Sequence, residues 1–499
     1  MGDAENMPDH SGESGLLPRS ALIGLVAGAA IPVITLLVEP PAGLSPGGWH
    51  TLGLALLMAI WWSTEPVPIG VTALLPLILL PLIGQGDVTT AAQAYANPLV
   101  FLFLGGFLLA AGINRWGLHR RLAYSVVRAI GTEPRRLVLG FMVACGMLSM
   151  AISNTAAVVL MLPVATSVTA ALALAHGGDD VNVHRFSRAL LLGLAYSASI
   201  GGMGTLIGTP PNALLAGYLA ESHGIDFSFA AWALVGVPLV LVFLPLAWLV
   251  LTRVAFPVSA AFSASMSADD LVSKLADHAP MSPAEKRVAI VFSVAAALWI
   301  ARPLLNRLPV LENLSDAAIA LAAAFALFLI PNGLAGRHQF LLSWKDARDI
   351  PWSVLLLFGG GLSLASAMDR SGLAQWIGTG LASIDGLTPY AFLLLLTFTV
   401  LMLTELASNT ATVAALLPVV ATMASAAGIE LIVVTAAVAL AASCAFMLPV
   451  ATPPNAIVFS TGELRVADMM KAGFYMNILS VVLVATAARL LAPVLAALG

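Results

Sequence analysis

The stretch SMAISNTAAVVLMLP at residues 149–163 places Ser153, Asn154 and Thr155 between two apolar flanks. The same pattern returns as TELASNTATVAALLP at residues 404–418. A polar group inside an apolar segment is costly unless it finds a partner. Two such triplets in equivalent surroundings therefore indicate that these polar groups have a specific structural or binding role.

The composition defines the setting of these triplets. Hydrophobic residues make up 60% and charged residues 10% of the 499 positions, and the mean hydropathy is +0.96, which predicts an all-α polytopic membrane protein. Residues 1–20 predict a polar cytoplasmic tail without the features of a signal peptide. The two cysteines lie in apolar segments, and nucleotide-binding, hydrolase and metal-site motifs are missing. We expect a lipid bilayer as partner, no nucleic acid and no enzymatic activity.

Apolar runs long enough for spanning helices predict about 11 transmembrane helices. They lie near 21–38, 50–64, 69–84, 97–113, 188–206, 230–252, 288–302, 315–331, 352–369, 431–450 and 473–496. Two further blocks, 137–174 and 389–424, are too long for one span and carry the SNT triplets near their centres. Each block is predicted to form a re-entrant hairpin whose tip is the triplet.

The two hairpins belong to an internal repeat. Residues 255 positions apart match, and they include Ser149 with Thr404, Ser153 with Ser408, Pro163 with Pro418, and Arg115 with Arg370. The TPPN sequences at 209–212 and 452–455 match at an offset of 243. Arginines crowd residues 115–136, whereas the equivalent residues 370–391 have one, so the positive-inside rule predicts that the two segments face opposite sides. This gives an inverted-topology repeat with a cytoplasmic N-terminus and an external C-terminus, an arrangement that often holds a binding site at the bilayer midplane.

The residue types at the tips suit anion and cation binding. Hydroxyls and amides donate to carboxylates, their oxygens ligate a hard cation such as Na+, and half-helix N-termini attract anions. The spacing of four between Ser149 and Ser153 predicts that they share a helical face, and the proline pairs of TPPN predict helix breaks.

Each of these features also has a structural interpretation. An isolated serine in a membrane helix usually bonds its own backbone, but two SNT tips in register with two TPPN breaks favour a binding site. The glycines near Gly105 and Gly360 are interpreted as close-packing surfaces. Glu405, the single charged residue of the two hairpins, is either a structural hydrogen-bonding group or part of ion coupling.

These motifs resemble those of the divalent anion/sodium symporters, the INDY-type di- and tricarboxylate transporters. The resemblance rests on both SNT triplets, SASIGGMGTLIGTPPN (197–212), FGGGLSL (358–364) and LPVATPPNAIVFS (448–460). It implies a bacterial inner-membrane homodimer in which a transport domain moves against a scaffold domain as an elevator. The implied parts are a tail 1–20, scaffold helices 21–113, a cytoplasmic connector 114–136, transport part 137–254, scaffold helices 255–370, an external connector 371–388 and transport part 389–499.

The resemblance also assigns residues to sites. The first sodium site would use Ser149, Ser153, Asn154 and Gly208, and the second Thr404, Ala407, Asn409 and Ala451. The substrate carboxylates would contact Ser153, Asn154, Thr155, Thr209, Ser408, Asn409, Thr410, Thr452 and Pro453.

Neither hairpin contains Lys or Arg, so bound Na+ is predicted to offset the charge of a dianion. The resulting hypothesis is sodium-coupled import of C4-dicarboxylates such as succinate, malate and fumarate. Three alternatives stay open: a dicarboxylate exchanger without net sodium coupling, a citrate or sulfate symporter of the same family, and an anion channel built from similar half-helices.

Overall fold

The computed structural model describes residues 19–130, 133–176, 180–259, 280–333, 339–381, 387–490 and 493. Within these ranges the regular elements are helices, apart from an isolated bridge between Pro331 and Phe340. Most of the predicted polar tail lies outside the described residues, as does part of the predicted external connector. The fold is therefore all-helical over the described chain, as the composition predicts.

The first half contains a hairpin and a broken helix, which follow helices α1 to α7. Its helices are α1 (Arg19–Leu37), α2 (Pro46–Thr64), α3 (Ile69–Thr72), α4 (Leu75–Leu82), α5 (Val88–Gln93), α6 (Pro98–Arg115), α7 (Leu118–Ile130), α8 (Pro134–Ser149), α9 (Asn154–His176), α10 (Val181–Gly202), α11 (Pro210–His223) and α12 (Phe229–Leu249). A 3₁₀ turn at Ala94–Ala96 precedes α6, and a π-helical turn at Val250–Ala255 extends α12.

The second half repeats this plan. Its helices are α14 (Pro283–Leu305), α15 (Asp316–Leu329), α16 (Trp352–Arg370), α17 (Leu373–Leu381), α18 (Pro389–Thr404), α19 (Asn409–Ala426), α20 (Leu431–Ala442), α21 (Pro453–Phe459) and α22 (Val466–Leu490). A 3₁₀ turn at Asp346–Asp349 precedes α16.

Five described helices are long and apolar enough to cross a membrane by length and composition. They are Pro98–Arg115, Phe229–Ala255, Pro283–Leu305, Trp352–Arg370 and Val466–Leu490. Seven shorter apolar helices accompany them among the described residues, and four of these belong to the hairpins and the second broken helix. An integral membrane protein follows from these helices, whereas the number of complete spans stays a prediction.

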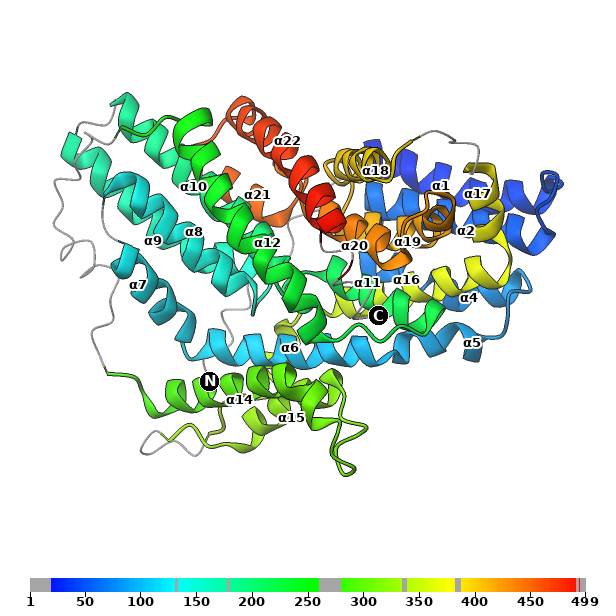
Figure 1. Ribbon diagram of the computed structural model, residues 1–499, viewed down its shortest axis with the longest axis horizontal. Helices are drawn as coiled ribbons and strands as arrows, with labels where there is room; N and C mark the ends of the chain where they lie inside the picture. Colours follow the sequence, from blue (N-terminus) through cyan, green and yellow to red (C-terminus); the bar gives the residue numbers. More distant parts are fainter. Residues whose placement is uncertain are drawn as a thin grey trace, which may run out of the picture.

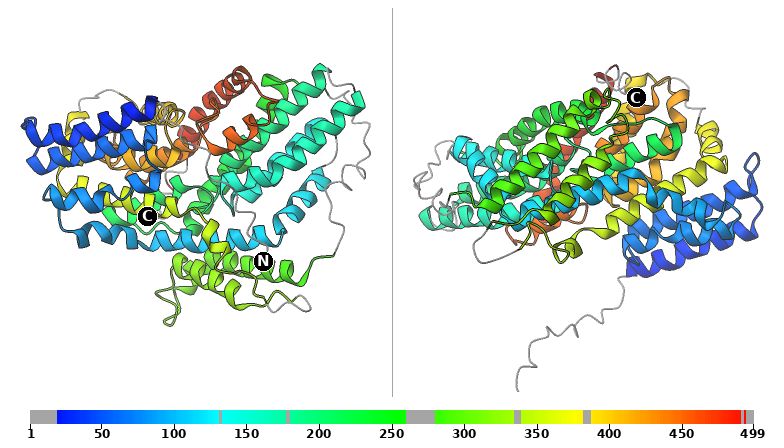
Figure 2. Two further views of the ribbon diagram at one scale, coloured as in Figure 1. Left: turned by 180° about the vertical axis from the view of Figure 1, so that it is seen from behind. Right: turned by 90° about the horizontal axis from the view of Figure 1, so that it is seen from below.

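The broken helices of each half pack against the hairpin of the other half. Helix α11 contacts α19, and α21 contacts α9, while α8 and α9 also contact α10 just as α18 and α19 contact α20. Figure 1 shows α8 and α9 toward one end of the long axis, α1 and α2 toward the other, and α20 and α21 between them, and the view from behind agrees (Figure 2). The two halves therefore share one core instead of folding side by side as separate units.

Glycines permit close contacts between the halves outside the hairpins. A methyl group at Gly105 on α6 would lie 2.6 Å from the carbonyl carbon of Ala320 on α15, and one at Gly360 on α16 would lie 2.3 Å from the carbonyl oxygen of Ala73. Any side chain there would push the helices apart. These contacts support the close-packing interpretation of both glycines.

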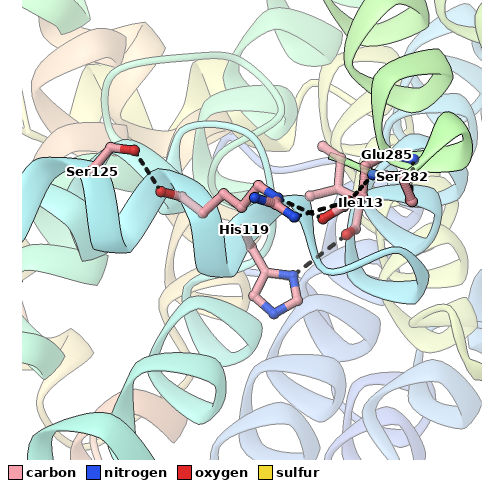
Figure 3. Close-up of polar contacts among 6 residues, drawn as sticks. Ile113, His119, Ser125, Ser282 and Glu285 are labelled. Carbon is pink, nitrogen blue, oxygen red and sulfur yellow. Dashed lines mark hydrogen bonds and ion pairs between the residues drawn. The ribbon is translucent and has the colours of Figure 1, made fainter. Parts of the chain in front are cut away.

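The arginine-rich connector forms α7 and is tied to the neighbouring elements. The Arg121 side chain donates to Glu285 Oε1 at 2.8 Å, and Glu285 in turn accepts from the backbone N–H of Ser282. Figure 3 shows Glu285 and Ser282 together at one end of this contact. The His119 ring lies beneath it, with a ring nitrogen 3.4 Å from the carbonyl oxygen of Ile113. The connector is thus packed against α14 as well as α8.

Candidate functional site

Each SNT triplet lies where one half-helix ends and the next begins. Helix α8 ends at Ser149 and α9 begins at Asn154, while α18 ends at Thr404 and α19 begins at Asn409. Four non-helical residues separate the halves in both hairpins. The hydroxyl that closes the first half-helix therefore meets the asparagine that opens the second.

In the first hairpin, Ser149, Asn154 and two backbone carbonyls form one polar group. The fully buried Ser149 hydroxyl lies 2.6 Å from Asn154 Oδ1 and 2.7 Å from the Ala198 carbonyl oxygen. The same end of the Asn154 amide lies 3.1 Å from the Ala198 carbonyl oxygen and 3.2 Å from that of Gly208. With the amide nitrogen facing inward, the orientation that pairs donors with acceptors, its two N–H groups are shared among the other three oxygens. With the amide oxygen facing inward, four oxygens converge.

In the second hairpin, Thr404 and Asn409 form the equivalent group. The fully buried Thr404 hydroxyl lies 2.7 Å from Asn409 Oδ1 and 2.9 Å from the carbonyl oxygen of Ala442. Ala442 is the last residue of α20, so its carbonyl has no partner inside its own helix. Neutral hydroxyl, amide and carbonyl oxygens are ligands that suit a hard monovalent cation, and this donor set fits Na+ in both hairpins.

The structure brings together some of the predicted sodium ligands and not others. Ser149, Asn154 and Gly208 meet, and so do Thr404 and Asn409. Ser153 instead caps α9, because its hydroxyl accepts from the Ala156 N–H at 3.3 Å. Within the described part of the chain, no hydrogen bond joins Ala407 or Ala451 to Thr404 or Asn409; their N–H groups donate to the carbonyls of Leu403 and Leu448. The carbonyls of Ala198 and Ala442 were missed because backbone ligands leave no side-chain signal in the sequence.

The predicted shared helical face of Ser149 and Ser153 is wrong. The chain leaves the helix directly after Ser149, and Ser153 stands before the next helix, where its carbonyl accepts from the N–H of Ala157. The spacing of four reflects the four-residue tip and not one turn of helix. Position 408 in the second hairpin likewise precedes α19.

The TPPN sequences break their helices as predicted. Thr209 and Thr452 have extended backbones, with φ of −144° and −142°, and α11 and α21 begin at the prolines that follow. Proline is tolerated at a first helical position because its missing N–H would have no partner there. Both threonines are buried, whereas Pro453 is exposed.

The asparagines of TPPN hold the unwound segments, a role that the sequence analysis did not assign. Asn212 Nδ2 donates to the carbonyls of Gly202 at 3.1 Å and Thr205 at 2.8 Å. Asn455 Nδ2 makes the equivalent bonds, to the carbonyls of Ala445 at 3.2 Å and Leu448 at 3.0 Å. The signal was available, since an asparagine after a helix break is suited to bond freed carbonyls.

The predicted substrate residues lie around these groups. Ser153, Asn154, Thr155, Ser408 and Asn409 are half-buried, and Thr410 is buried. Helices α9 and α19 begin at the triplets, so their unpaired N–H groups add positive partial charge at the tips. The tips thus combine oxygens that suit a cation with N–H groups that suit an anion.

An all-helical chain with paired hairpin tips and paired broken helices belongs to the class of polytopic membrane transport proteins, and no enzyme chemistry is needed to explain its polar groups. Residues 19–498 match the family described as the sodium:sulfate symporter transmembrane region, and the chain belongs to that family.

Curated relatives agree with this family. The sodium-dependent dicarboxylate transporter SdcS of Staphylococcus saprophyticus is 42% identical over 476 residues, which cover 95% of this chain and 91% of that protein. SdcS of Staphylococcus aureus is 40% identical over 472 residues, covering 93% and 89%.

Solved structures share the fold at low sequence identity. The YdaH transporter of Alcanivorax borkumensis has a TM-score of 0.61 at 15% identity, covering 95% of this chain and 98% of that one. MtrF of Neisseria gonorrhoeae has a TM-score of 0.56 at 13% identity, covering 95% of both chains. These two likenesses concern the fold alone.

Proposed function

We propose that this protein is a sodium-coupled importer of C4-dicarboxylates. The observation that carries the proposal is the pair of oxygen groups at the hairpin tips, built from Ser149 with Asn154 and from Thr404 with Asn409. The relatives named as sodium-dependent dicarboxylate transporters supply the substrate class. An exchanger, a citrate or sulfate symporter and an anion channel remain the competing hypotheses.

The proposed sodium sites lie inside the two hairpins. The first uses Ser149, Asn154 and the carbonyl of Gly208, with the carbonyl of Ala198 added from the geometry. The second uses Thr404 and Asn409, with the carbonyl of Ala442 added. Ser153, Ala407 and Ala451 stay part of the proposal as ligands that would join when the tips close around the ions.

The proposed substrate site lies between the tips. Ser153, Asn154 and Thr155 would bind one carboxylate, Ser408, Asn409 and Thr410 the other, and Thr209, Thr452 and Pro453 would line the space between. Residues 137–174 and 389–424, which include both tips, contain no Lys or Arg, so bound Na+ offsets the charge of the dianion. Anion binding then depends on sodium, which is the physical basis of coupling.

The proposed movement is that of an elevator within a homodimer, with the N-terminus cytoplasmic and the C-terminus external. Parts 137–254 and 389–499 would move as one body against the scaffold helices. Helix α9 packs against α21, and α11 packs against α19, so the hairpin of each half contacts the broken helix of the other half. This packing supports the proposal that the two parts move as one body. A bacterial inner membrane is the proposed location.

The test is uptake of radiolabelled succinate into proteoliposomes that contain the purified protein, with an inward gradient of Na+ or of K+. Concentrative uptake with Na+ alone is the expected result. Uptake only into vesicles preloaded with dicarboxylate would show that the protein is an exchanger and would overturn the proposal. Uptake of labelled citrate or sulfate in place of succinate would change the substrate, and single-channel currents would favour a channel.

A further inference from the structure

Glu405 is a buried carboxylate whose hydrogen bonds converge on one segment of backbone. It is 4% exposed and follows directly after α18. Its Oε1 accepts from the backbone N–H groups of Phe446 at 2.8 Å and Met447 at 2.9 Å, and its Oε2 accepts from that of Leu448 at 3.2 Å. Asn477 Nδ2 on α22 donates to Oε1 at 2.8 Å. Four N–H donors therefore satisfy the carboxylate.

The segment that Glu405 holds is the break between α20 and α21, residues 443–452. The carbonyl oxygen of Phe446 accepts a hydrogen bond from the Tyr196 hydroxyl at 2.8 Å. The peptide unit between Phe446 and Met447 is therefore hydrogen-bonded through both its carbonyl oxygen and its N–H. Asn455 bonds two further carbonyls of the segment. A segment without regular hydrogen bonds thus receives a defined shape from side chains.

The first half has no charged group in the equivalent place. The residue 255 positions before Glu405 is Met150. The break after α10 is instead held by neutral groups: Trp232 Nε1 donates to the carbonyl of Met203 at 2.8 Å, and the Thr205 hydroxyl donates to that of Met150 at 2.6 Å. A buried carboxylate therefore holds the backbone beside the second proposed sodium site, whereas neutral side chains hold the backbone beside the first.

From this asymmetry we propose that Glu405 is a positioning residue that keeps the second sodium site preformed, so that this site fills before the first. The inference rests on the proposed sodium sites. The held segment begins next to Ala442, whose carbonyl contacts Thr404, and it leads into the buried Thr452. By fixing this segment, Glu405 would hold in place the proposed carbonyl ligand of Ala451 within it and that of Ala442 directly before it, before an ion arrives.

Two physical effects act in the same direction. Hydrogen bonds to an ionised carboxylate are stronger than bonds between neutral groups, so the segment 443–452 is held more firmly than its counterpart. A ligand set that is already in place avoids the cost of ordering it on binding, which raises affinity. The negative charge beside Thr404 also favours a cation nearby, and neither the second hairpin nor this segment contains Lys or Arg.

The experiment measures sodium occupancy at each hairpin separately. Ala151→Cys and Leu406→Cys are placed at equivalent tip positions, 255 residues apart, in two separate proteins. The native Cys145 and Cys444 are fully buried, so a maleimide reagent reads the introduced thiol. Alkylation rates are measured over a Na+ titration in lipid nanodiscs without substrate, and each reporter must first retain succinate uptake. Proteins without an introduced cysteine, with and without Glu405→Gln, supply the background.

The proposal expects Na+ to protect the Leu406→Cys reporter at a lower concentration than the Ala151→Cys reporter. Glu405→Gln keeps the shape but removes the charge and turns an NH₂ group toward a backbone donor. It should raise the half-protecting Na+ concentration at position 406 at least tenfold and change it less than twofold at position 151. A purely structural role would move both reporters together.

Asn477→Leu provides a second variant of similar size that removes one of the four donors. It should raise the half-protecting Na+ concentration about threefold at position 406 and leave that at position 151 unchanged. If Glu405→Gln does not fold, this variant tests the positioning role of Glu405 in its place. Equal shifts at both positions, or none, would overturn the proposal. Absence of Na+ protection at both tips of the unmodified reporters would contradict the sodium sites themselves, and the inference would fall with them.

Discussion

The hydroxyl of Ser149 lies 2.6 Å from the inward-facing end of the Asn154 side-chain amide, and this contact joins the last residue of one half-helix to the first residue of the next. The second half repeats the relationship in Thr404 and Asn409 at 2.7 Å. In both cases the hydroxyl also meets a backbone carbonyl from the following helix. Side chains and backbone from three helices therefore define each proposed cation site.

Removal of either asparagine should abolish sodium-dependent uptake. Asn154→Ala and Asn409→Ala each delete a side chain that the proposal uses for both Na+ and substrate, while the tips are half-buried and should fold without it. The measurement is succinate uptake in proteoliposomes, with gel filtration to verify folding. Asn182→Ala, at the start of α10 and far along the helix from Ala198, serves as the control. Near-normal uptake by both tip variants would disprove the site assignment.

Removal of the hydroxyls should weaken sodium binding more than substrate binding. Ser149→Ala and Thr404→Val each delete one oxygen ligand at a fully buried position. We expect the Na+ concentration for half-maximal uptake to rise roughly tenfold, which corresponds to about 1.4 kcal/mol. The succinate KM at saturating Na+ should change little. A raised succinate KM with an unchanged Na+ requirement would assign the hydroxyls to the substrate instead.

Gly201→Ala should destabilise the first hairpin. A methyl group there would lie 2.2 Å from the carbonyl oxygen of Gly146, and backbone cannot move aside as a flexible side chain does. We expect a loss of about 1–3 kcal/mol, seen as a lower Tm in nanodiscs. Gly106→Ala is the control, because its methyl group would meet the side chain of Ile207 at 3.3 Å. Equal Tm values for the two variants would refute the close contact of α8 and α10.

Asp346 should contribute stability that is lost in acid. Burial acts to raise the pKa of this carboxyl, but hydrogen bonds from Ser343 and the charge of Arg115 outweigh it and hold the pKa below its ordinary value. A group whose pKa is lowered by folding stabilises the fold above its unfolded-state pKa, and this contribution disappears as the pH falls through the folded-state pKa.

Asp346→Asn should therefore lower stability at pH 7 by about 1 kcal/mol, since the pair is partly exposed. The difference from the unmodified protein should stay constant between about pH 6 and pH 8, begin to shrink near pH 4, and disappear as the pH falls through the lowered folded-state pKa. Thermal unfolding in nanodiscs, followed by tryptophan fluorescence, measures both. A difference that grows as the pH falls would contradict the sign of this contribution.

Much of the architecture could be predicted because membrane folding constrains sequence strongly. Long apolar runs, polar triplets inside them and proline pairs each have few physical interpretations when backbone groups must be satisfied within hydrocarbon. The offset between Ser149 and Thr404 revealed the repeat, and the prolines after Thr209 and Thr452 located both helix breaks. The sequence placed Ser149 and Asn154 in one predicted site, but it also paired Ser149 with Ser153 on a helical face that the structure does not form.

The tertiary structure decided what lies across from those tips. Ala198 and Ala442 contribute carbonyls, which every residue has, so no pattern in the sequence marks them. The sequence offered two roles for Glu405 but did not identify its partners, because its four donors come from segments more than forty residues away. Sequence patterns report local geometry and repetition, whereas ligands and hydrogen bonds between distant segments depend on how the helices pack.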